Sequence, residues 1–444
     1  MTSKSAQRDA AATDRLRHPD PSFPRLHGRP SRGWLNDPHG CIQIDGRYHV
    51  FFQHNPDRQA HEQMHWGHMS STDLAHWDNE PIALFNRPGE LDEFGCWTGS
   101  LIDDAGTPTI AYSAVANASE DAAVLLARSD REMRTWRQDT EPVCGLPKDP
   151  AVTHARDPFM FEFEGHRYAV QGAGSYAGPG AARVLVYACD DLTSWTELGP
   201  LVSAAEDDVA ASLAPADVWE CPNLFPLGDR WVLIVSLWSR THWEIVAKDV
   251  RYLVGDLQPT ADGPRFRTTS GGPLDRGPTF YAPQILRETE RTLIWGWARE
   301  HGRPQDAIDA AGWAGTLTFC RQLRLDGGRL ISEPVPELRQ LRQEALALQP
   351  EIPFEASAFD VELGSGAGVA SLWLTEDGHE SLVAEFEVSD ASLTQPRVLV
   401  DGSIVEVFDG TGVSYTTRAY PTKTSMWRLR LEHPVEVSAW TLGA

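Results

Sequence analysis

The stretch Trp34-Leu35-Asn36-Asp37-Pro38 is the first of five short segments that recur at nearly constant spacing along this chain of 444 residues. The other four are Trp97-Thr98-Gly99-Ser100, Arg156-Asp157-Pro158, Trp219-Glu220-Cys221-Pro222 and Phe280-Tyr281-Ala282. Counted between Asp37, Thr98, Asp157, Glu220 and Tyr281, the intervals are 61, 59, 63 and 61 residues. A period of about sixty residues that holds over five units indicates a radial repeat, in which every unit delivers one residue to a shared axis.

A second periodic feature supports this interpretation. Turn residues followed by a tryptophan recur at Trp77, Trp136 and Trp195, and successive tryptophans are 59 residues apart. Strand-forming runs separated by turn dipeptides dominate the same region, as in Tyr48-His49-Val50-Phe51-Phe52 after the turn Asp45-Gly46. Four strands with their turns fill about sixty residues, so residues 25–333 are predicted to form a five-bladed β-propeller.

The segments on either side of the repeat have different patterns. Residues 1–24 are rich in charged and small polar residues and are expected to form a disordered leader. Apolar residues on one helical face between two prolines predict a linker helix over residues 334–350. These residues are Leu338, Leu341, Ala345 and Leu348. Alternation returns in residues 351–444 and predicts a β-sandwich. The expected fold class is therefore all-β, with a five-bladed β-propeller followed by a C-terminal β-sandwich.

The balance of charges restricts the partners of this chain. It has 39 Lys and Arg residues against 63 Asp and Glu residues, a formal net charge of −24, which argues against nucleic acid or an anionic membrane as partner. No stretch has the length of a membrane span, and the N-terminal segment lacks the apolar core of a secretory signal. The six cysteines are scattered without CxxC spacing, so a cytoplasmic protein with free thiols is expected.

Three of the five recurring segments carry a carboxylate. A pair of carboxylates that face each other across one site is what a glycoside hydrolase uses for catalysis. Beside Asn36, Asp37 is expected to stay ionised, as a nucleophile must. Glu220 is placed in a less polar setting, which suits a general acid. Asp157 follows Arg156, which is expected to hold it ionised for binding sugar hydroxyls.

Aromatic side chains near these segments are candidates for the pocket wall. Flat ring faces pack well against the C–H faces of sugars, although most of the sixteen Trp residues are accounted for by packing between β-sheets. Trp66, Trp97 and Tyr281 are expected to line the pocket, together with Thr98.

One motif suggests a different chemistry. The run His61-Glu62-Gln63-Met64-His65 matches the HExxH pattern of zinc proteases, with His68 as a further candidate ligand. That pattern binds zinc on a helix, where positions i and i+4 share one face. Here the run lies between Asn55-Pro56 and Gly67 without an apolar face or a cap. A loop beside the pocket is therefore expected, and no metal.

These segments resemble the glycoside hydrolase family 32 enzymes, which include invertases and fructan exohydrolases. The run Gly33-Trp34-Leu35-Asn36-Asp37-Pro38-His39-Gly40 is similar to the opening motif of the family, with His39 where Asn is usual. Thr98 stands where the family's Trp-Ser-Gly-Ser segment has Ser. Other segments that resemble the family are Phe51-Phe52-Gln53-His54-Asn55-Pro56, Trp66-Gly67-His68, Arg156-Asp157-Pro158 and Glu220-Cys221-Pro222.

The resemblance implies a role for each carboxylate: Asp37 as nucleophile, Glu220 as acid/base and Asp157 as transition-state stabiliser. It also implies a five-bladed propeller with an added sandwich, and neither a metal nor another cofactor. The residues expected to contact the sugar are Asn36, Gln53, Trp66, Trp97, Thr98, Arg156 and Tyr281.

The sequence therefore predicts a retaining, exo-acting β-fructofuranosidase that releases fructose from sucrose and short fructo-oligosaccharides. Two alternatives within the family stay open: a sucrose-6-phosphate hydrolase, for which Arg240 and Lys248 are candidate phosphate contacts, and a fructosyltransferase. A non-catalytic fructan-binding protein is the alternative outside the enzyme class. The expected partner is a small sugar, and the chain is expected to be a monomer or a homodimer.

Overall fold

The computed structural model describes residues 15–117, 122–240 and 245–444. The prediction of an all-β chain is confirmed, because most described residues lie in strands. The named helices are short: the α-helices α2 (Asp208–Leu213) and α3 (Gln305–Ala311), and the 3₁₀ helices η1 (Pro179–Ala181) and η2 (Pro336–Leu341). In the described part of the chain, no helix is long and apolar enough to cross a membrane.

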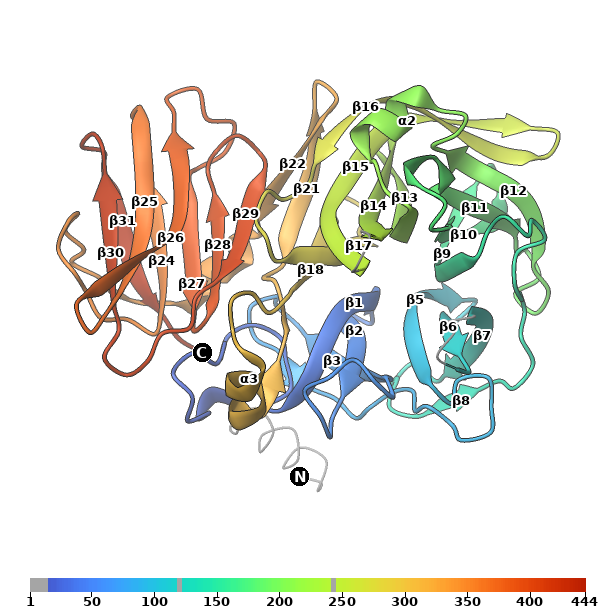
Figure 1. Ribbon diagram of the computed structural model, residues 1–444, viewed down its shortest axis with the longest axis horizontal. Coiled ribbons are helices and arrows are strands. Elements are labelled where there is room, and N and C mark those ends of the chain that lie inside the picture. Colours follow the sequence, from blue (N-terminus) through green and yellow to red (C-terminus); the bar gives the residue numbers. More distant parts are fainter. Residues whose placement is uncertain (1–14, 118–121, 241–244) are drawn as a thin grey trace.

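Five groups of mainly antiparallel strands surround a common centre (Figure 1), and we call them units 1 to 5 and, together, the ring. Unit 1 contains β1 (Gly33–Ile44), β2 (Arg47–Asn55), β3 (His65–Ser71), β4 (Asp78–Asn79) and the short β19 (Trp313–Ala314). Unit 2 contains β5 (Gly95–Asp104), β6 (Thr107–Val115), β7 (Ala122–Ser129) and β8 (Trp136–Gln138). Unit 3 contains β9 (His154–Phe163), β10 (His166–Gly174), β11 (Arg183–Ala188) and β12 (Thr196–Ser203).

Units 4 and 5 complete the ring. Unit 4 contains β13 (Val218–Leu227), β14 (Arg230–Arg240), β15 (Ile245–Thr260) and β16 (Gly263–Pro273). It joins unit 3 in one sheet through the pair Gly174 and Val218. Unit 5 contains β17 (Phe280–Arg287), β18 (Thr292–Ala298), β20 (Thr316–Leu317), β21 (Arg321–Asp326) and β22 (Arg329–Pro334).

The first strand of each unit is its innermost strand, and these inner strands close on one another. β1 contacts both β5 and β17, while β9 contacts β5 and β13, and β13 contacts β17. Closure also involves the chain ends of the ring, because β19 pairs in parallel with β1 through Gly33–Trp313 and Trp34–Ala314. The first and last parts of the ring are therefore joined by backbone hydrogen bonds.

Every inner strand contains an irregularity at an equivalent place. The strand register shifts between Asn36 and Pro38 in β1, between Cys96 and Gly99 in β5, and between Glu220 and Asn223 in β13. A corresponding shift separates Arg156 from Phe159 in β9 and Tyr281 from Gln284 in β17. Each shift coincides with one of the five recurring segments of the sequence. The period of about sixty residues therefore arises because a β-bulge recurs once in every unit.

The tryptophan repeat also has a structural counterpart. Trp77 directly precedes β4, Trp136 begins β8 and Trp195 directly precedes β12. The indole N–H groups of Trp136 and Trp195 donate to the carbonyls three residues earlier, those of Met133 and Leu192. The expectation that these tryptophans occupy the same place in successive units is confirmed.

Apolar side chains fill the seams between neighbouring units. In the seam between units 1 and 2, for example, Phe51 and Trp66 pack in one cluster with Leu101 and Tyr112. Similar clusters occupy the seams between units 2 and 3, 3 and 4, 4 and 5, and 5 and 1. Because burial of this apolar surface stabilises each seam, the polar inner strands can be held in place around the centre.

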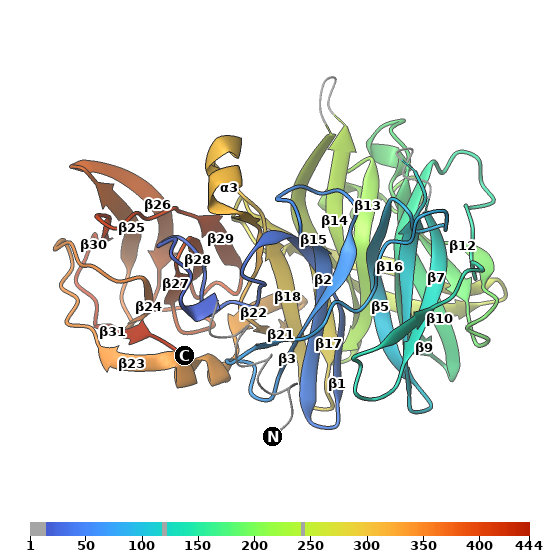
Figure 2. The same ribbon diagram turned by 90° about the horizontal axis from the view of Figure 1, so that it is seen from below.

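Two further sheets lie beside the ring (Figures 1 and 2). One contains β23 (Arg342–Ala345), β24 (Ala358–Leu363), β27 (Arg397–Asp401), β28 (Ile404–Phe408), β29 (Ser414–Arg418) and β31 (Val437–Leu442). The other contains β25 (Gly368–Glu376), β26 (His379–Val388) and β30 (Met426–Leu431). Buried residues from both sheets, including Phe359 and Trp427, form one cluster.

The predicted linker helix over 334–350 is wrong. The segment forms the 3₁₀ helix η2 and then β23, which pairs with β31. Leu338 and Leu341 are buried in the seam between units 5 and 1, but the rest of the apolar pattern does not continue as a helix. Arg342 instead lies over the ring of Trp440, at 3.7 Å from its centroid, and pairs with Asp360. Strand pairing and these contacts outweigh the weak local preference for a helix.

The predicted disordered leader over 1–24 is wrong where it can be tested. Residues 1–14 lie outside the described residues, but 15–24 pack against the ring. Arg15 is buried and donates to the carbonyl of Trp77 at 3.0 Å. Phe23 is also buried, and Asp20 accepts from the indole N–H of Trp313. The polar composition of this segment gave no sign of its contacts with residues far away in the chain.

A buried cluster of charged residues connects the ring to the six-stranded C-terminal sheet, and we call it the joint cluster. Arg321 pairs with Glu406 at 2.6 Å and with Asp275 at 3.0 Å. His27 lies between Asp401, at 2.9 Å, and Glu406, at 3.0 Å. All five side chains are buried, so the contact between the two parts of the molecule is electrostatic as well as apolar.

Candidate active site

The β-bulges turn the side chains of the recurring segments toward the centre. Asp37 and Asp157 have positive φ values of 22° and 62°, and Cys221 and Ala282 have values of 48° and 43°. A positive φ is costly for residues other than glycine and is often found where function requires it. Cys221, rather than Glu220, is therefore the backbone equivalent of Asp157, and Glu220 precedes that position by one residue.

Asp37 receives more side-chain donors than the other two carboxylates. Its Oδ2 accepts from the Thr98 hydroxyl at 2.7 Å and from the Gln53 amide at 3.1 Å, while its Oδ1 accepts from Asn36 at 2.9 Å. Asn36 is in turn oriented by the indole N–H of Trp34, at 2.7 Å. These contacts hold the Asp37 carboxylate in one orientation, as a nucleophile requires.

Glu220 is held from both sides by polar partners. Oε1 accepts two hydrogen bonds from Arg156, from Nε at 2.9 Å and from Nη2 at 2.7 Å. Oε2 accepts the hydroxyl of Tyr281 at 2.7 Å, and the same hydroxyl lies 3.2 Å from the carbonyl of Leu237. The expected pairing of Arg156 with Asp157 and the expected less polar setting of Glu220 are both wrong. Sequence neighbours on a strand point to opposite faces, so Arg156 reaches across to unit 4.

Asp157 is held mainly by the segment that follows Glu220. Its Oδ2 accepts from the backbone N–H of Cys221 at 2.9 Å and lies 3.4 Å from the Cys221 sulfur. Its own N–H donates to the hydroxyl of Ser113 at 2.8 Å. The Cys221 sulfur also lies 3.9 Å from Oδ2 of Asp37. The three carboxylates therefore belong to one connected group at the centre of the ring.

The electrostatics of the group follow from its burial. Burial, together with the charge of Glu220, raises the pKa of Asp37 to about 6, against the hydrogen bonds from Asn36 and Thr98, which lower it. Burial and the charge of Glu220 also raise the pKa of Asp157. The pKa of the Cys221 thiol is raised as well, chiefly by burial, so Cys221 stays protonated and can donate to a carboxylate.

The remaining predicted contact residues divide into two sets. Asn36, Gln53, Thr98, Arg156 and Tyr281 all contact a carboxylate directly, as described above. Trp97 lies beside them, with the guanidinium carbon of Arg156 5.9 Å from its ring centroid.

Trp66 does not belong to the pocket wall. It has no exposed surface, donates to the carbonyl of Trp97 at 3.0 Å and stacks on the ring of His39 at 3.7 Å between centroids. The expected sugar contact is therefore wrong, and Trp66 is a packing residue. His39 is buried beside it, and burial lowers its pKa well below the usual value, so this departure from the family motif adds no charge beneath the site.

The HExxH segment is not helical, as expected from its sequence. Its first three residues lie outside regular structure, Met64 forms an isolated bridge with Gly95, and His65 begins β3. His61 lies 2.9 Å from the side-chain carbonyl oxygen of Gln53 and packs against Trp97. The segment therefore borders the carboxylate group.

Two residues of the site were missed by the sequence analysis: the Cys221 thiol and the Ser113 hydroxyl. Asp157 and Cys221 occupy the same position in their bulges. An alignment of the repeats on Asp157 would therefore have indicated Cys221 and not Glu220. Ser113 lies on β6, the second strand of its unit, where the repeat gives no signal.

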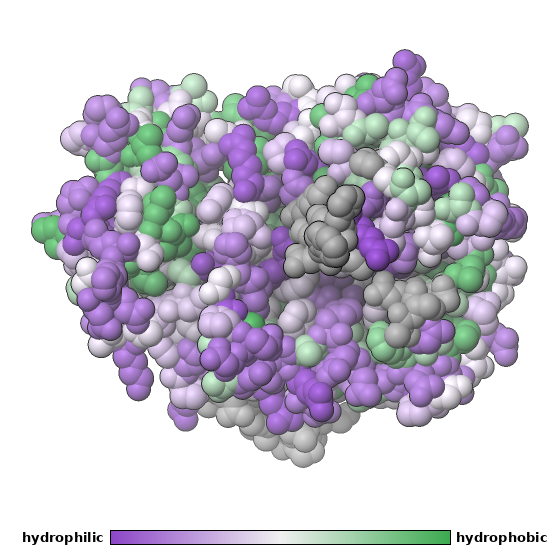
Figure 3. Space-filling view, in the orientation of Figure 1, coloured by the Kyte–Doolittle hydropathy of each residue, from purple (hydrophilic) through white to green (hydrophobic). Residues whose placement is uncertain are grey.

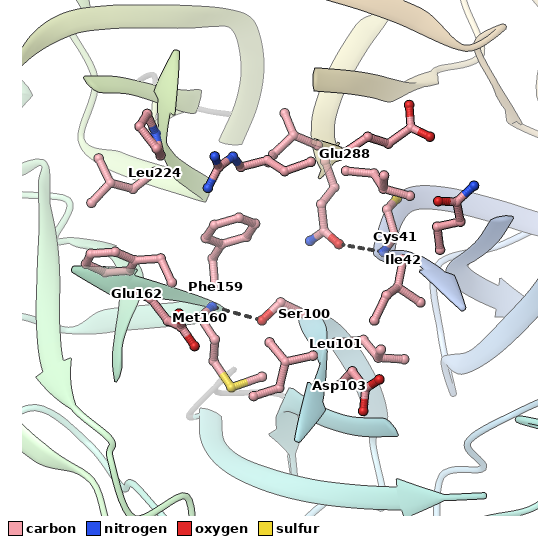
Figure 4. Close-up of a pocket in the computed structure, with 18 of the residues that line it drawn as sticks. Cys41, Ile42, Ser100, Leu101, Asp103, Phe159, Met160, Glu162, Leu224 and Glu288 are labelled. Atoms are coloured by element: carbon pink, nitrogen blue, oxygen red, sulfur yellow. Dashed lines mark hydrogen bonds between the residues drawn. The ribbon is translucent and has the colours of Figure 1, made fainter. Parts of the chain in front are cut away.

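In the space-filling view the surface is hollowed at the centre of the ring, with hydrophilic residues beside the hollow (Figure 3). A cavity of about 800 Å³ lies farther along the inner strands, lined by residues such as Phe159, Met160, Leu224 and Glu288 (Figure 4). None of the three carboxylates lines it. Gln284 bridges the strands there by accepting from the N–H of Cys41 and donating to the carbonyl of Gly99. The group of three carboxylates therefore lies away from this cavity.

Comparison with known proteins agrees with this geometry. Residues 27–334 match the N-terminal domain of the glycosyl hydrolases family 32, which is more than half of the chain. The chain belongs to glycoside hydrolase family 32. It is accordingly an enzyme, a glycoside hydrolase.

Curated relatives match nearly the whole chain. A sucrose-6-phosphate hydrolase of Klebsiella pneumoniae is 32% identical over 95% of this chain and 94% of its own. A raffinose invertase of Escherichia coli is 30% identical over 91% of this chain and 90% of its own. Among solved structures, a family 32 β-fructofuranosidase of Bombyx mori has a TM-score of 0.81 at 24% identity, covering 99% of both chains. This last likeness shows a shared fold.

Proposed function

We propose that this family 32 hydrolase is a retaining, exo-acting β-fructofuranosidase that releases fructose from sucrose and short fructo-oligosaccharides. The observation that carries the proposal is the connected group of three buried carboxylates, in which Asp37 is aligned by three side-chain donors. Two carboxylic groups with different partners are what a retaining mechanism requires, one as nucleophile and one as acid and base.

In the first step, Asp37 attacks the anomeric carbon of the fructosyl group. The bond from that carbon to the leaving oxygen breaks, and Glu220 gives its proton to this oxygen. With a pKa of about 6, Asp37 is mostly ionised at neutral pH. Asp157 accepts hydrogen bonds from the sugar hydroxyls as charge develops on the ring. In the second step, Glu220 takes a proton from water, the oxygen of which attacks the fructosyl–Asp37 ester, so that configuration is retained.

The hydroxyl of Tyr281 gives Glu220 a way to hold or release the proton. Donation to Oε2 at 2.7 Å suits the carboxylate form of Glu220. When Oε2 carries the proton, the hydroxyl can donate instead to the carbonyl of Leu237, which is 3.2 Å away. A rotation of one hydroxyl group then accompanies each proton transfer.

The arrangement of the strand units supports the finer fold assignment. Each unit has a bulged inner strand that faces the centre, and the Bombyx mori enzyme shares the fold over nearly its whole length. We take the ring to be a five-bladed β-propeller and the two C-terminal sheets to be a β-sandwich. The bulges then place one side chain from each blade at the same mouth of the central channel.

A second candidate is hydrolysis of sucrose 6-phosphate. Several family 32 relatives carry that activity in their names, including the proteins from Klebsiella pneumoniae and Salmonella typhimurium at 32% identity. Fructosyl transfer is a third outcome of the same intermediate, if a sugar hydroxyl replaces water in the second step. Product analysis on sucrose, sucrose 6-phosphate, kestose, inulin and levan distinguishes these activities.

The test of the mechanism compares the wild type with Asp37→Ala and Glu220→Ala. Loss of the acid/base is expected to lower turnover by about 10²–10⁴-fold, and loss of the nucleophile by at least as much. Added azide should give a fructosyl azide of inverted configuration with Asp37→Ala and of retained configuration with Glu220→Ala. Near-normal fructose release by either variant would sink the assignment, and a wild type that binds fructan without releasing fructose would favour a non-catalytic binding protein.

A further inference from the structure

Each oxygen of the Asp37 carboxylate accepts a hydrogen bond from a side-chain amide whose own oxygen contacts an aromatic nitrogen. On the Oδ1 side, the amide nitrogen of Asn36 donates to Asp37 at 2.9 Å. The amide oxygen of Asn36 accepts the indole N–H of Trp34 at 2.7 Å. An indole nitrogen can only donate, so this contact determines which end of the Asn36 amide faces the carboxylate.

On the Oδ2 side, the imidazole of His61 occupies the corresponding place beside the amide of Gln53. The amide nitrogen of Gln53 lies 3.1 Å from Oδ2 of Asp37 and 2.7 Å from the hydroxyl oxygen of Thr98. The amide oxygen of Gln53 lies 2.9 Å from Nε2 of His61. Unlike an indole, an imidazole nitrogen can donate or accept, so the role of His61 depends on where its hydrogen lies.

The hydrogen atoms along these contacts can be assigned one after another, starting at the carboxylate. An ionised Asp37 only accepts hydrogen bonds, so the hydroxyl of Thr98 gives its hydrogen to Oδ2. The oxygen of Thr98 then accepts from Gln53, which requires the NH₂ end of the amide on this side. The amide oxygen therefore faces His61 and can only accept, so Nε2 of His61 carries the hydrogen.

The surroundings of His61 keep the imidazole neutral. The residue as a whole is exposed, but its ring packs edge-on against the rings of Trp34 and Trp97, with centroids 6.3 and 5.3 Å away. Desolvation of the ring by its neighbours, together with the charge of Arg156, lowers the pKa of His61 to about 4. At neutral pH a single ring nitrogen therefore carries a hydrogen, and the contact with Gln53 selects Nε2.

We propose that His61 is a positioning residue, which donates its Nε2–H to Gln53 and so keeps the amide N–H of Gln53 directed at the Asp37 carboxylate. This inference rests on the proposed function, in which Asp37 is the nucleophile. A fixed donor keeps the carboxylate oriented for attack and favours its anion. The first residue of the HExxH run then acts on the reaction through two hydrogen bonds.

Other titrating and charged groups also face Asp37 and His61. On the neighbouring inner strands these are Arg156, Asp157, Glu220 and Cys221, and in the loop of His61 they are Arg58 and Glu62, which pair with each other. These groups titrate in the wild type and in the variants alike. A comparison between variants of the acid limb of the pH profile therefore isolates the contribution of His61.

The experiment measures kcat and kcat/KM on sucrose across pH for the wild type, His61→Leu and His61→Gln. His61→Leu removes the donor, so kcat should fall by about 3- to 10-fold. The acid limb of kcat/KM should move to higher pH, because the anion of Asp37 is less favoured. His61→Gln can donate from its own amide and should recover most of the loss. The matched control is His166→Leu, an exposed histidine of unit 3 that pairs with Asp190, which should change neither value.

A double variant separates positioning from a merely structural role. Because His61 acts through Gln53, its replacement by leucine should lower kcat by no more than about twofold once Gln53 is also leucine. Losses that multiply in the double variant would overturn the inference. An acid limb that stays in place in His61→Leu would overturn it too.

A spectroscopic measurement on the unmodified protein makes the inference independent of turnover. With ¹⁵N-labelled histidine, NMR between pH 5 and 8 distinguishes the Nε2–H form of the ring from the Nδ1–H form, and comparison with His61→Gln assigns the signals. The Nε2–H form supports the inference even if no fructose is released, in which case only the proposed function falls. The Nδ1–H form would refute the inference whatever the activity.

Discussion

The Asp37 carboxylate shows how single contacts determine the pH range in which a group of the site is ionised. Burial favours its protonated form, whereas the hydrogen bonds from Asn36 and Thr98 favour the anion, and the balance is a pKa of about 6. In its proposed role as nucleophile, Asp37 must be ionised, so the donors that favour the anion are expected to govern activity. Thr98 is the closest of them, at 2.7 Å.

Replacing Thr98 tests this balance. Thr98→Val removes one donor to the anion while keeping the shape of the side chain, so the pKa of Asp37 should rise above about 6. The acid limb of the kcat/KM profile, which reports the free enzyme, is expected to move to higher pH, with a loss of about tenfold in rate at pH 5. Thr98→Ser keeps the hydroxyl and should leave the limb in place. A valine variant with the wild-type acid limb would refute this role.

The pairing around Glu220 could not be read from the sequence. Arg156 is next to Asp157 in the chain, yet it binds Glu220, because a bulge and the alternation of strand side chains separate neighbouring residues. The three carboxylates were predictable, since each occurs in a repeated segment. Their partners come from other units at separations that the sequence does not encode locally.

Among the structural elements, the bulged inner strands are the ones that create the site. They put non-glycine residues into a region of positive φ, at Asp37, Asp157, Cys221 and Ala282. Ala282 is fully buried, and its N–H donates to the hydroxyl of Ser236 at 3.1 Å. Its side chain has no polar group, so a substitution at this position tests only the backbone conformation that the bulge requires.

Substitution of Ala282 measures this requirement. Ala282→Val places a β-branched side chain at positive φ in a packed core, and we expect a loss of about 2–4 kcal/mol in the free energy of unfolding. Ala282→Gly fits the backbone and should stay within about 1 kcal/mol of the wild type. Urea unfolding followed by fluorescence gives both values. Equal midpoints for the valine and glycine variants would show that the bulge is not under this constraint.

The sequence predicted regular elements well where a pattern was long and local. The strands of the ring follow from repeated strand–turn–strand runs. The linker helix failed because its apolar residues serve a 3₁₀ turn and then a strand, with Arg342 fixed by contacts to Trp440 and Asp360. The leader failed because Phe23 and Arg15 are buried by partners far away in the chain, which composition does not reveal.

At the scale of the whole molecule, the joint cluster makes the contact between the ring and the C-terminal sheets dependent on protonation. His27 is surrounded by Asp401 and Glu406, with Arg321 and Asp275 beyond them and the ring of Phe319 at 3.6 Å. Hydrogen bonds and charges from the two acids raise the pKa of His27 despite its burial. Three acids thus face one arginine and one titrating histidine.

The dependence of stability on pH follows from the sign of this shift. A group whose pKa is raised in the folded state stabilises it fully below the unfolded pKa of about 6.5, and this contribution is lost as pH rises through the folded value. We expect His27→Gln to lose about 1–3 kcal/mol at pH 6 and to approach the wild type as the pH is raised above 7. Denaturation midpoints between pH 6 and 9 test this. His76→Gln, at an exposed site, is the control, and a constant difference across the range would contradict the assignment.

The parallel pairing of β1 with β19 has a consequence for how the protein is made. β1 leaves the ribosome early, and the strand that completes its second edge follows about 280 residues later. At typical rates of synthesis, the strand that carries Asp37 waits on the order of tens of seconds for this partner. A nascent chain therefore exposes one open strand edge for that time, and the carboxylate group also lacks the Tyr281 hydroxyl until unit 5 has been made.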